Sequence, residues 1–244
     1  MKKPNRICWW FNTWFALILL SKFSGMAHAQ PFTEEKYSEI MWNYLGTLSE
    51  FGPRYVGTTG YIKTLNLIRK VGAEFADDVV EHQLVIKRHN GEQIQMVNIE
   101  FIFNGTVGGR PILLGAHYDT RPFADQEPDS KLHDRPILGV NDGGSGTVVL
   151  LGLAHYLKAY PASQPIRLMF FDGEDFGKSG AGEMFIGSNY HASQLEKLPL
   201  EHWPLAVIII DMVGDKDLEI FKETYSMASG SELLDRIYEI AKRQ

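Results

Sequence analysis

The chain has 244 residues, with 24 Lys and Arg against 30 Asp and Glu, so its net charge is −6. The length suits one fairly large domain, and an apolar content of 44% is ordinary for a globular protein. The acidic balance argues against nucleic acid as a partner, because phosphates are bound by a basic face.

The first 29 residues carry the pattern of a cleaved secretory signal peptide. A basic start is followed by the apolar run WFALILL at 14–20, and AHA at 27–29 fits an A-x-A cleavage site. We therefore predict that the mature protein begins at Gln30 and is secreted or periplasmic. The only cysteine, Cys8, lies in this leader, so the mature chain has no thiol for a disulfide or a metal.

A membrane anchor is the alternative interpretation of this leader. Polar Thr13 and Lys22 interrupt its apolar run well short of the roughly 20 apolar residues that a span needs. No other segment of the sequence is long and apolar enough, so we expect no membrane span after cleavage. We expect residues 30–244 to form one domain without an internal linker.

Periodicity and turn residues predict the elements in chain order. Helices are expected at 33–50, 62–75, 147–160, 183–195 and 231–243, and strands at 79–87, 94–103, 111–116, 166–171, 205–210 and 218–221. The second helix would place Ile62, Leu65 and Ile68 on one apolar side. The run LAVIII at 205–210 is typical of a strand covered on both faces. Strands alternating with helices predict an α/β three-layer sandwich with a central mixed, mostly parallel sheet flanked by helices.

Acidic residues gather where the predicted strands end. The segment ILLGAHYD ends in His117 and Asp119, and the segment LMFFDGED ends in Asp172, Glu174 and Asp175. Asp211 directly follows the predicted strand at 205–210. Asp142 lies in GVNDGGSG, just before a predicted helix. In open α/β sheets, ligands bind outside the carboxyl ends of the strands. Converging carboxylates would repel one another unless a cation lay between them. His and carboxylates without thiols suit a catalytic zinc.

Each of these residues also has a simpler structural interpretation. Asp142 could cap the helix that follows it, His117 could be a hydrogen-bonded core histidine, and Asp211 could begin a turn. The joint occurrence at several strand ends, with glycines beside them, favours the metal site. Other motifs fail, because DGGSGT lacks the last glycine of a nucleophile elbow and no Walker loop is present.

The four segments GAHYDT, GVNDGGSG, FFDGED and IIIDMVG together resemble the zinc exopeptidases of the aminopeptidase type. They resemble more closely the glutaminyl-peptide cyclotransferase branch of that superfamily and its bacterial relatives. FFDGE followed by a second acid is typical of that branch, and GPRYVGTTGY resembles its N-terminal segment. The spacing of about a dozen residues from Asp175 to Gly187 also favours it. The resemblance extends from about Gly52 to Asp217.

The resemblance implies roles for individual residues. It implies one or two zinc ions, with metal ligands drawn from His117, Asp142, Asp175 and Asp211. Glu174 would be the general base beside the metal. Asp211 would bind a zinc ion in a two-metal aminopeptidase or hydrogen-bond the substrate in a one-zinc cyclase. His117 would be a ligand in the two-metal case.

The resemblance implies an enzyme that acts on the N-termini of peptides or proteins. The first expectation is cyclisation of N-terminal glutamine to pyroglutamate with release of ammonia. The alternative is a di-zinc aminopeptidase that hydrolyses the first peptide bond, and a different class of function is an inactive, exported binding module. The family's last metal ligand is a histidine near the C-terminus, whereas the last histidine here is His202. We therefore expect the domain at 30–244 to lack its C-terminal part.

Overall fold

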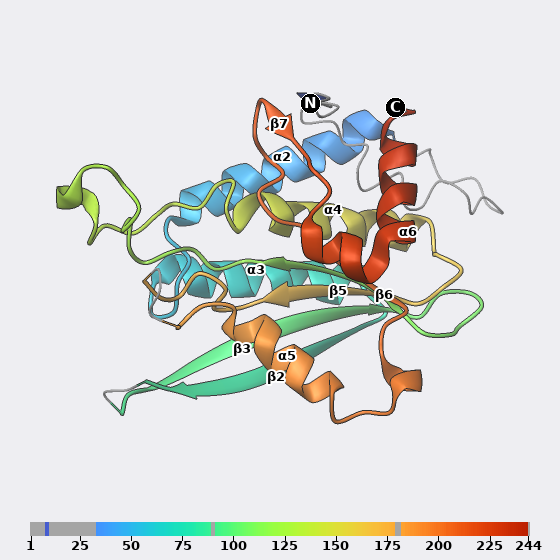
Figure 1. The fold of residues 1–244 in the computed structure, drawn as a ribbon, viewed down its shortest axis with the longest axis horizontal. Helices are drawn as coiled ribbons and strands as arrows, with labels where there is room; N and C mark the ends of the chain where they lie inside the picture. The colour runs from blue at the N-terminus through green and yellow to red at the C-terminus, as the bar shows by residue number, and fades with distance from the viewer. Residues whose placement is uncertain (1–7, 10–32, 89–90, 179–181, 244) are drawn as a thin grey trace.

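The computed structural model describes residues 8–9, 33–88, 91–178 and 182–243 (Figure 1). Its helices are α2 (Glu34–Phe51), α3 (Thr59–Phe75), α4 (Gly144–Ala159), α5 (Ile186–Leu195) and α6 (Thr224–Ala241). One sheet holds β2 (Asp78–Lys87), β3 (Gln93–Phe103), β4 (Ile112–His117), β5 (Ile166–Phe171) and β6 (Ala206–Ile209). A small second sheet pairs β1 (Cys8–Trp9) with β7 (Leu218–Glu219). Apart from β1, the predicted signal peptide lies outside the described residues.

The five-stranded sheet has the order β2-β3-β5-β4-β6. β5, β4 and β6 run parallel to one another, and the β2–β3 hairpin adds two antiparallel strands at one edge. In this register His117 of β4 lies opposite Phe171 of β5, and Gly115 lies opposite Ile209 of β6. The carboxyl ends of the three parallel strands therefore meet at one edge of the sheet, where ligands bind in open α/β folds.

Helices cover both faces of this sheet and confirm the predicted three-layer α/β sandwich (Figure 1). α3 and α4 contact one face, and α2 packs on both of these helices. α5 contacts β3 from the other face. None of the described helices combines the length and apolar character needed to cross a membrane.

Local chemistry explains where the first two long helices begin. Thr33 has extended backbone before α2, and its hydroxyl accepts the N–H of Lys36 at 3.3 Å. Thr58 caps α3 in the same way, accepting the N–H of Tyr61 at 3.1 Å. Such caps satisfy amide donors that have no partner within the helix, and each typically contributes about 1 kcal/mol.

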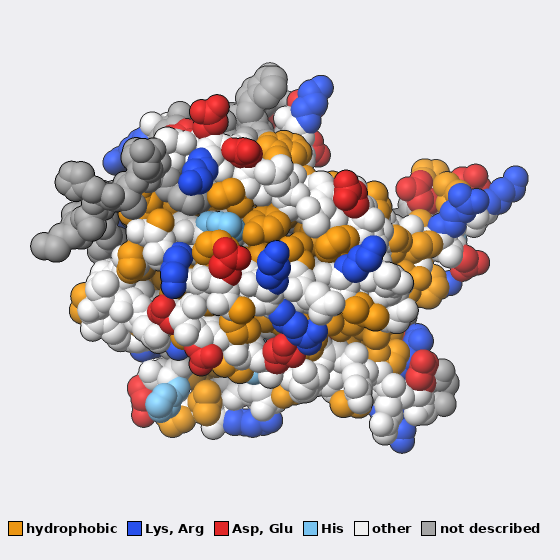
Figure 2. All heavy atoms as spheres, turned by 180° about the vertical axis from the view of Figure 1, so that it is seen from behind, with side chains coloured by type: hydrophobic (Ala, Val, Ile, Leu, Met, Phe, Trp, Pro, Cys, Tyr) orange, Lys and Arg blue, Asp and Glu red, His pale blue; other side chains and the backbone are white. Residues whose placement is uncertain are grey.

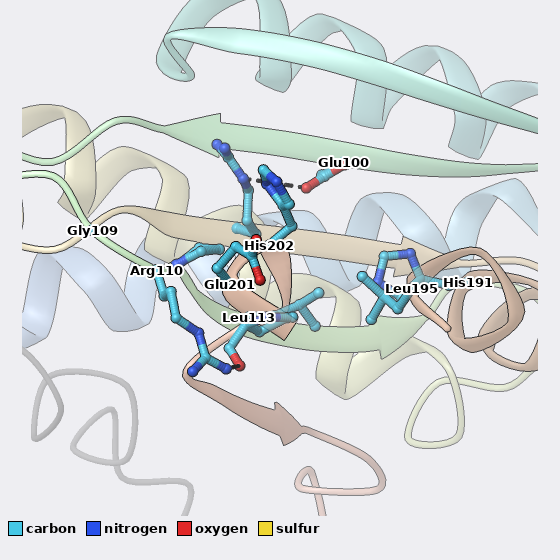
Figure 3. A pocket seen from close by; sticks show the side chains of 11 residues that line it. Glu100, Gly109, Arg110, Leu113, His191, Leu195, Glu201 and His202 are labelled. Atoms are coloured by element: carbon cyan, nitrogen blue, oxygen red, sulfur yellow. Dashed lines mark hydrogen bonds and ion pairs between the residues drawn. The ribbon is translucent and has the colours of Figure 1, made fainter. Parts of the chain in front are cut away.

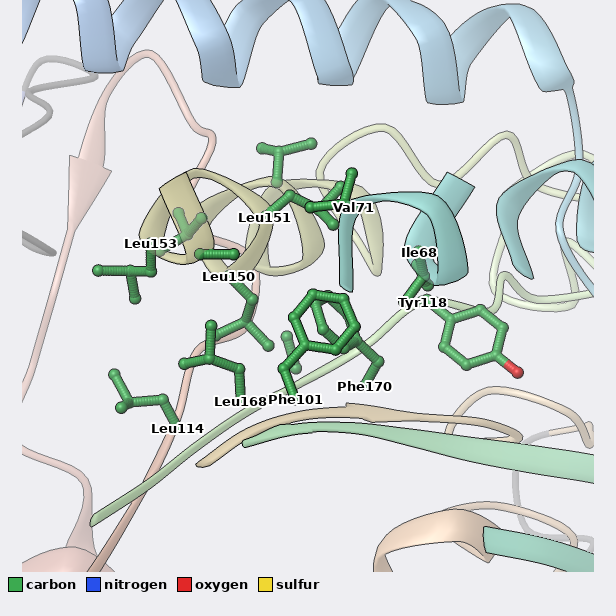
Figure 4. Close-up of a cluster of buried hydrophobic side chains, with 14 of the residues drawn as sticks. Ile68, Val71, Phe101, Leu114, Tyr118, Leu150, Leu151, Leu153, Leu168 and Phe170 are labelled. Carbon is green, nitrogen blue, oxygen red and sulfur yellow. The ribbon is translucent and has the colours of Figure 1, made fainter. Parts of the chain in front are cut away.

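The main core lies between the sheet and the three helices α2, α3 and α4 (Figure 4). The rings of Phe101 and Phe170, from neighbouring strands, pack with their centroids 4.7 Å apart. Leu150 and Leu151 of α4 and Ile68 of α3 are fully buried against them. Burial of each such side chain contributes about 1.5–3 kcal/mol, so this cluster fixes the strand ends relative to α4.

Two predictions of burial are wrong. Val207 and Ile209 of β6 are 53% and 58% exposed, although the run was expected to be covered on both faces. β6 is an edge strand, and its residues alternate between partly buried and exposed. Ile62 is 57% exposed, because the buried side of α3 is formed instead by Tyr61, Leu65 and Ile68.

Other predicted boundaries shift by a few residues. α5 begins at Ile186, three residues later than expected, and α6 begins at Thr224, with non-helical backbone at Gly230. The polar loop 121–136 contains a short 3₁₀ turn (Ser130–Leu132) and projects from one end of the molecule (Figure 1). Seen from behind, it carries acidic and basic side chains side by side (Figure 2).

Candidate metal centre

The residues of the candidate centre lie at the carboxyl ends of the parallel strands. His117 is the last residue of β4 and is 4% exposed. Glu174 and Asp175 follow β5, and Asp211 follows β6. Asp142 stands two residues before α4, where Gly143 has a φ of +74° and a Cβ would clash with the carbonyl oxygen of Asp119. The tight turn into α4 therefore requires glycine.

Two clusters of ligand atoms share Asp142. One consists of His117, Asp142 and Asp211, and the other of Asp142, Glu174 and Asp175, with the ligand atoms of each cluster within 4.8 Å of one another. His117 Nε2 lies 3.0 Å from Asp142 Oδ1 and 3.4 Å from Asp211 Oδ1. His117 Nδ1 lies 3.8 Å from Glu174 Oε2. The five residues to which the resemblance gave metal or catalytic roles therefore meet in one place, whereas the carboxylate of Asp172 accepts hydrogen bonds from Tyr61 and Val97 instead.

The buried carboxylate of Asp119 contacts three residues of this centre. Its Oδ1 accepts the backbone N–H of Glu174 at 3.1 Å, and its Oδ2 accepts that of Asp175 at 3.0 Å. Oδ1 also lies 3.4 Å from His117 Nδ1. One buried carboxylate thus fixes both the turn after β5 and the histidine ring. The sequence placed Asp119 at a strand end but gave no reason to assign it this role.

Arg121 brings a positive charge to the second cluster. Its Nη1 lies 2.6 Å from Asp175 Oδ1, and its Nε lies 2.8 Å from Asp125 Oδ1. The three side chains are 11%, 6% and 14% exposed, in the order Arg121, Asp175 and Asp125. Sequence reasoning missed both Arg121 and Asp125, because their loop looked like a solvated connection.

Arg54 supports the loop that carries Asp142. It is fully buried, and its guanidinium donates to the carbonyl oxygens of Tyr118, Leu138 and Gly139 at 3.0, 2.9 and 2.6 Å. Its backbone N–H donates to Thr120 Oγ1 at 2.8 Å. Burial lowers the pKa of Arg54 to about 10, while Asp119 and Asp142 favour its charged form. The group therefore stays cationic at neutral pH.

Burial and neighbouring charges shift the pKa values of His117 and Glu174 away from their ordinary values. Burial opposes a charge on His117, but Asp119, Asp142 and Asp211 outweigh it and raise the pKa of His117 to about 12. These surroundings favour a positive charge at the ring, which a proton or a metal ion can supply. Burial raises the pKa of Glu174 to about 7. A carboxyl group with this pKa can exchange a proton near neutral pH.

A divalent metal fits the donor set. His117 Nε2 is buried and, among the described residues, makes no hydrogen bond, although two carboxylate oxygens face it. A buried polar atom without a partner is costly, and a cation between this nitrogen and the carboxylates would remove that cost. One imidazole with two carboxylates matches the ligands of catalytic zinc.

One further cavity lies away from these residues. It has a volume of about 280 Å³, and Glu100, Arg110, Leu113, His191 and His202 are among the side chains that line it (Figure 3). Leu113 stands near the start of β4, whereas His117 ends it. None of the candidate metal ligands lines this cavity.

Comparison with solved structures agrees with the fold. The glutaminyl cyclase of Bacteroides thetaiotaomicron, solved with N-acetylhistamine, is 27% identical with a TM-score of 0.76, covering 84% of this chain and 72% of that chain. A Zn-dependent exopeptidase from Parabacteroides distasonis ATCC 8503 is 26% identical with a TM-score of 0.71, covering 81% of this chain and 69% of that chain. The similarity therefore includes both cyclases and exopeptidases.

Sequence comparison gives the family. Aminopeptidase YwaD of Bacillus subtilis (strain 168) is 30% identical over 116 residues, which are 46% of this chain and 21% of that protein. The chain thus spans only about a fifth of the length of that relative. Residues 98–244, more than half of the chain, match peptidase family M28. This range includes the five acidic and histidine residues that meet at the strand ends. The chain belongs to peptidase family M28.

Proposed function

We propose that this chain is a zinc-dependent enzyme that converts the N-terminal glutamine of peptides or proteins into pyroglutamate and releases ammonia. Several structurally similar proteins are glutaminyl cyclases, including those of Bacteroides thetaiotaomicron and Tannerella forsythia. The observation that carries the proposal is the position of Glu174. This partly buried carboxyl group lies within 4.8 Å of the ligand atoms of Asp142 and Asp175, close enough to exchange a proton with a group bound beside the metal.

The roles of the residues follow from their positions. In a one-zinc cyclase, Asp142 and Asp175 would be among the ligands of the zinc ion, which would act as a Lewis acid on the γ-carbonyl of the substrate glutamine, and Asp211 would hydrogen-bond the substrate. Glu174 takes a proton from the α-amine as its nitrogen attacks the γ-carbonyl carbon. Glu174 then returns this proton to the departing NH₂ group, which leaves as ammonia. General acid–base catalysis of this kind typically contributes about 10²- to 10⁴-fold.

Hydrolysis of the first peptide bond is the second candidate function. The two carboxylate clusters that share Asp142 favour it, because this arrangement offers two neighbouring positions for cations. The similarity to an aminopeptidase of Bacillus subtilis supports it as well. In this reaction Glu174 would take its proton from the attacking water instead of from the substrate amine.

A glutamine substrate with a naphthylamide group distinguishes the candidates. Ammonia released without free naphthylamine indicates the cyclase, and free naphthylamine indicates the peptidase. If neither product forms and the protein takes up no zinc on titration, the chain is an inactive binding module. The first outcome is expected.

We also propose that the chain is exported after cleavage of residues 1–29. The predicted mature N-terminus is then Gln30, the residue type that the proposed reaction uses. Mass spectrometry of the exported protein would show a chain that starts at position 30, with the loss of ammonia that marks pyroglutamate. A protein that keeps its leader would contradict the export proposal without affecting the assignment of the active site.

A further inference from the structure

The cavity of about 280 Å³ lies between the sheet and α5 (Figure 3). Leu113 of β4 and Arg167 of β5 stand opposite each other in neighbouring strands, and both line it. His191 and Leu195 line it from α5. The cavity is therefore a space between packed elements, separate from the candidate metal centre.

Two buried nitrogen atoms of this lining make no hydrogen bond among the described residues. They are Nη1 of Arg167 and Nε2 of His191. The guanidinium of Arg167 reaches Glu100 through its Nε, at 3.4 Å from Oε1, while Oε2 of Glu100 lies 2.8 Å from His82 Nε2. This leaves Nη1 without an acceptor. A buried donor without an acceptor is costly, so a ligand oxygen at this place would be stabilising.

Neighbouring aromatic rings hold His191 in position. Its ring lies edge-on to that of Phe171, with centroids 5.9 Å apart, and to that of His82 at 6.2 Å. Burial lowers the pKa of His191 below its ordinary value, so the ring is uncharged at neutral pH. An uncharged imidazole carries one N–H and can donate it to a carboxylate oxygen.

The lining carries charges of both signs. Arg110 and Arg167 are cationic, and Glu100 and Glu201 are anionic. A simple anion would meet the two carboxylates, whereas a ligand with one charge of each sign matches this lining. A metal ion does not suit the cavity, because the groups of side chains that could hold one lie at the strand ends among the described residues.

Arg110 also shapes one wall of the cavity. Its Nε and Nη2 donate to the backbone carbonyl oxygens of Trp203 and Pro204, each at 2.8 Å. These bonds hold the segment after Glu201 against the start of β4. Glu201 itself is exposed, so its carboxylate stands where a ligand would enter.

We propose that this cavity binds a free α-amino acid with an aliphatic side chain, such as leucine. Its carboxylate accepts hydrogen bonds from Arg167 Nη1 and His191 Nε2, and its ammonium group faces Glu201. Its side chain lies against Leu113 and Leu195. A volume of about 280 Å³ has room for a molecule of roughly ten non-hydrogen atoms, which is the size of leucine. The site is independent of the proposed reaction.

Isothermal titration of the whole chain with L-leucine tests the proposal. We expect one equivalent to bind with a Kd of about 1 mM or tighter. L-leucinamide lacks the carboxylate and N-acetyl-L-leucine lacks the ammonium group, so each should bind at least about tenfold more weakly. No binding of leucine, or equal binding of either derivative, would overturn the proposal. Equal binding of acetate or inorganic phosphate would show a simple anion site and would also overturn it.

Two variants place the ligand in this cavity. Arg167→Met removes the guanidinium, and His191→Phe keeps an aromatic ring without the nitrogen, so each should weaken leucine binding about tenfold. His191→Phe decides the outcome if Arg167→Met does not fold. Arg88→Met is the matched control, because Arg88 pairs with Glu183 at 3.0 and 2.8 Å outside the cavity and should leave the affinity unchanged. Unchanged affinity in the folded cavity variants would overturn the proposal.

Asp142→Asn distinguishes this cavity from the candidate metal centre. It alters a candidate metal ligand that does not line the cavity, and the leucine affinity should stay within about twofold. Loss of leucine binding in this variant would place the amino acid at the metal centre and overturn the proposal. None of these measurements uses turnover, so they can fail while the cyclase or peptidase assay succeeds, and the converse also holds.

Discussion

The carboxylate of Asp119 accepts the backbone N–H of Asp175 at 3.0 Å, so a side chain at the end of β4 fixes the turn that follows β5. The same carboxylate holds the N–H of Glu174 and lies against the ring of His117. Three residues of the candidate centre thus depend on one buried carboxylate. Such supporting contacts typically affect metal affinity by about 10- to 100-fold.

Replacement of Asp119 by Ala should therefore weaken zinc binding by about 10- to 100-fold, because the ring of His117 and the turn at 174–175 lose their common support. Isothermal titration with zinc measures this change. Asp77→Ala is a matched control, since Asp77 also accepts a backbone N–H, that of Asn104 at 2.9 Å, far from the centre. Unchanged zinc affinity in Asp119→Ala would show that Asp119 has no supporting role.

Glu174→Gln should lower turnover by about 10²- to 10⁴-fold while zinc stays bound. The amide keeps the size of the side chain but cannot accept the proton that the reaction removes. Ammonia release from an N-terminal glutamine substrate and zinc content by metal analysis should be measured on the same sample. Turnover within a few-fold of the unaltered enzyme would exclude Glu174 as the base.

Arg54→Met should destabilise the fold by at least about 3 kcal/mol, because three buried carbonyl oxygens lose their charged donor. Urea unfolding measures this difference. Arg69→Met is the control, since Arg69 is 40% exposed in its pair with Glu81 and should contribute less than about 1 kcal/mol. Equal losses in the two variants would mean that Arg54 has no special structural role.

Asp172→Asn should flatten the dependence of stability on pH. Burial, followed by repulsion from Asp119, raises the pKa of Asp172 from 3.8 to about 7. Between these values the folded state binds the proton more strongly than the unfolded chain does, so this group lowers stability as pH rises from about 4 to about 7. Over this pH range the group lowers the free energy of unfolding by on the order of a few kcal/mol.

The asparagine at position 172 cannot titrate but can still accept the hydrogen bonds of Tyr61 and of the Val97 amide. Unfolding free energies should be compared at several pH values between 4 and 8 for both proteins. The expected result is a shallower decline for Asp172→Asn. Identical pH profiles would show that Asp172 keeps an ordinary pKa in the folded protein.

Much of the fold could be predicted from the sequence because its signals are local. Thr33 and Thr58 stand where helix caps belong, and the strand at Ile166–Phe171 is a short apolar run bounded by polar residues. The edge position of β6 could not be predicted, because a continuous apolar run gives no information about which neighbours cover it. The exposure of Val207 and Ile209 is a property of the assembled sheet.

The sequence by itself determined which residues come together at the strand ends: parallel strands carry His117, Glu174 and Asp211 to one edge wherever the helices pack. Only the tertiary structure decided which cation meets which carboxylate. Arg121 and Asp175 are 54 positions apart, and Arg54 and Gly139 are 85 positions apart. Pairing at such separations depends on the path of the intervening loops. That path follows from packing across the whole domain, for which no local pattern of residues provides a signal.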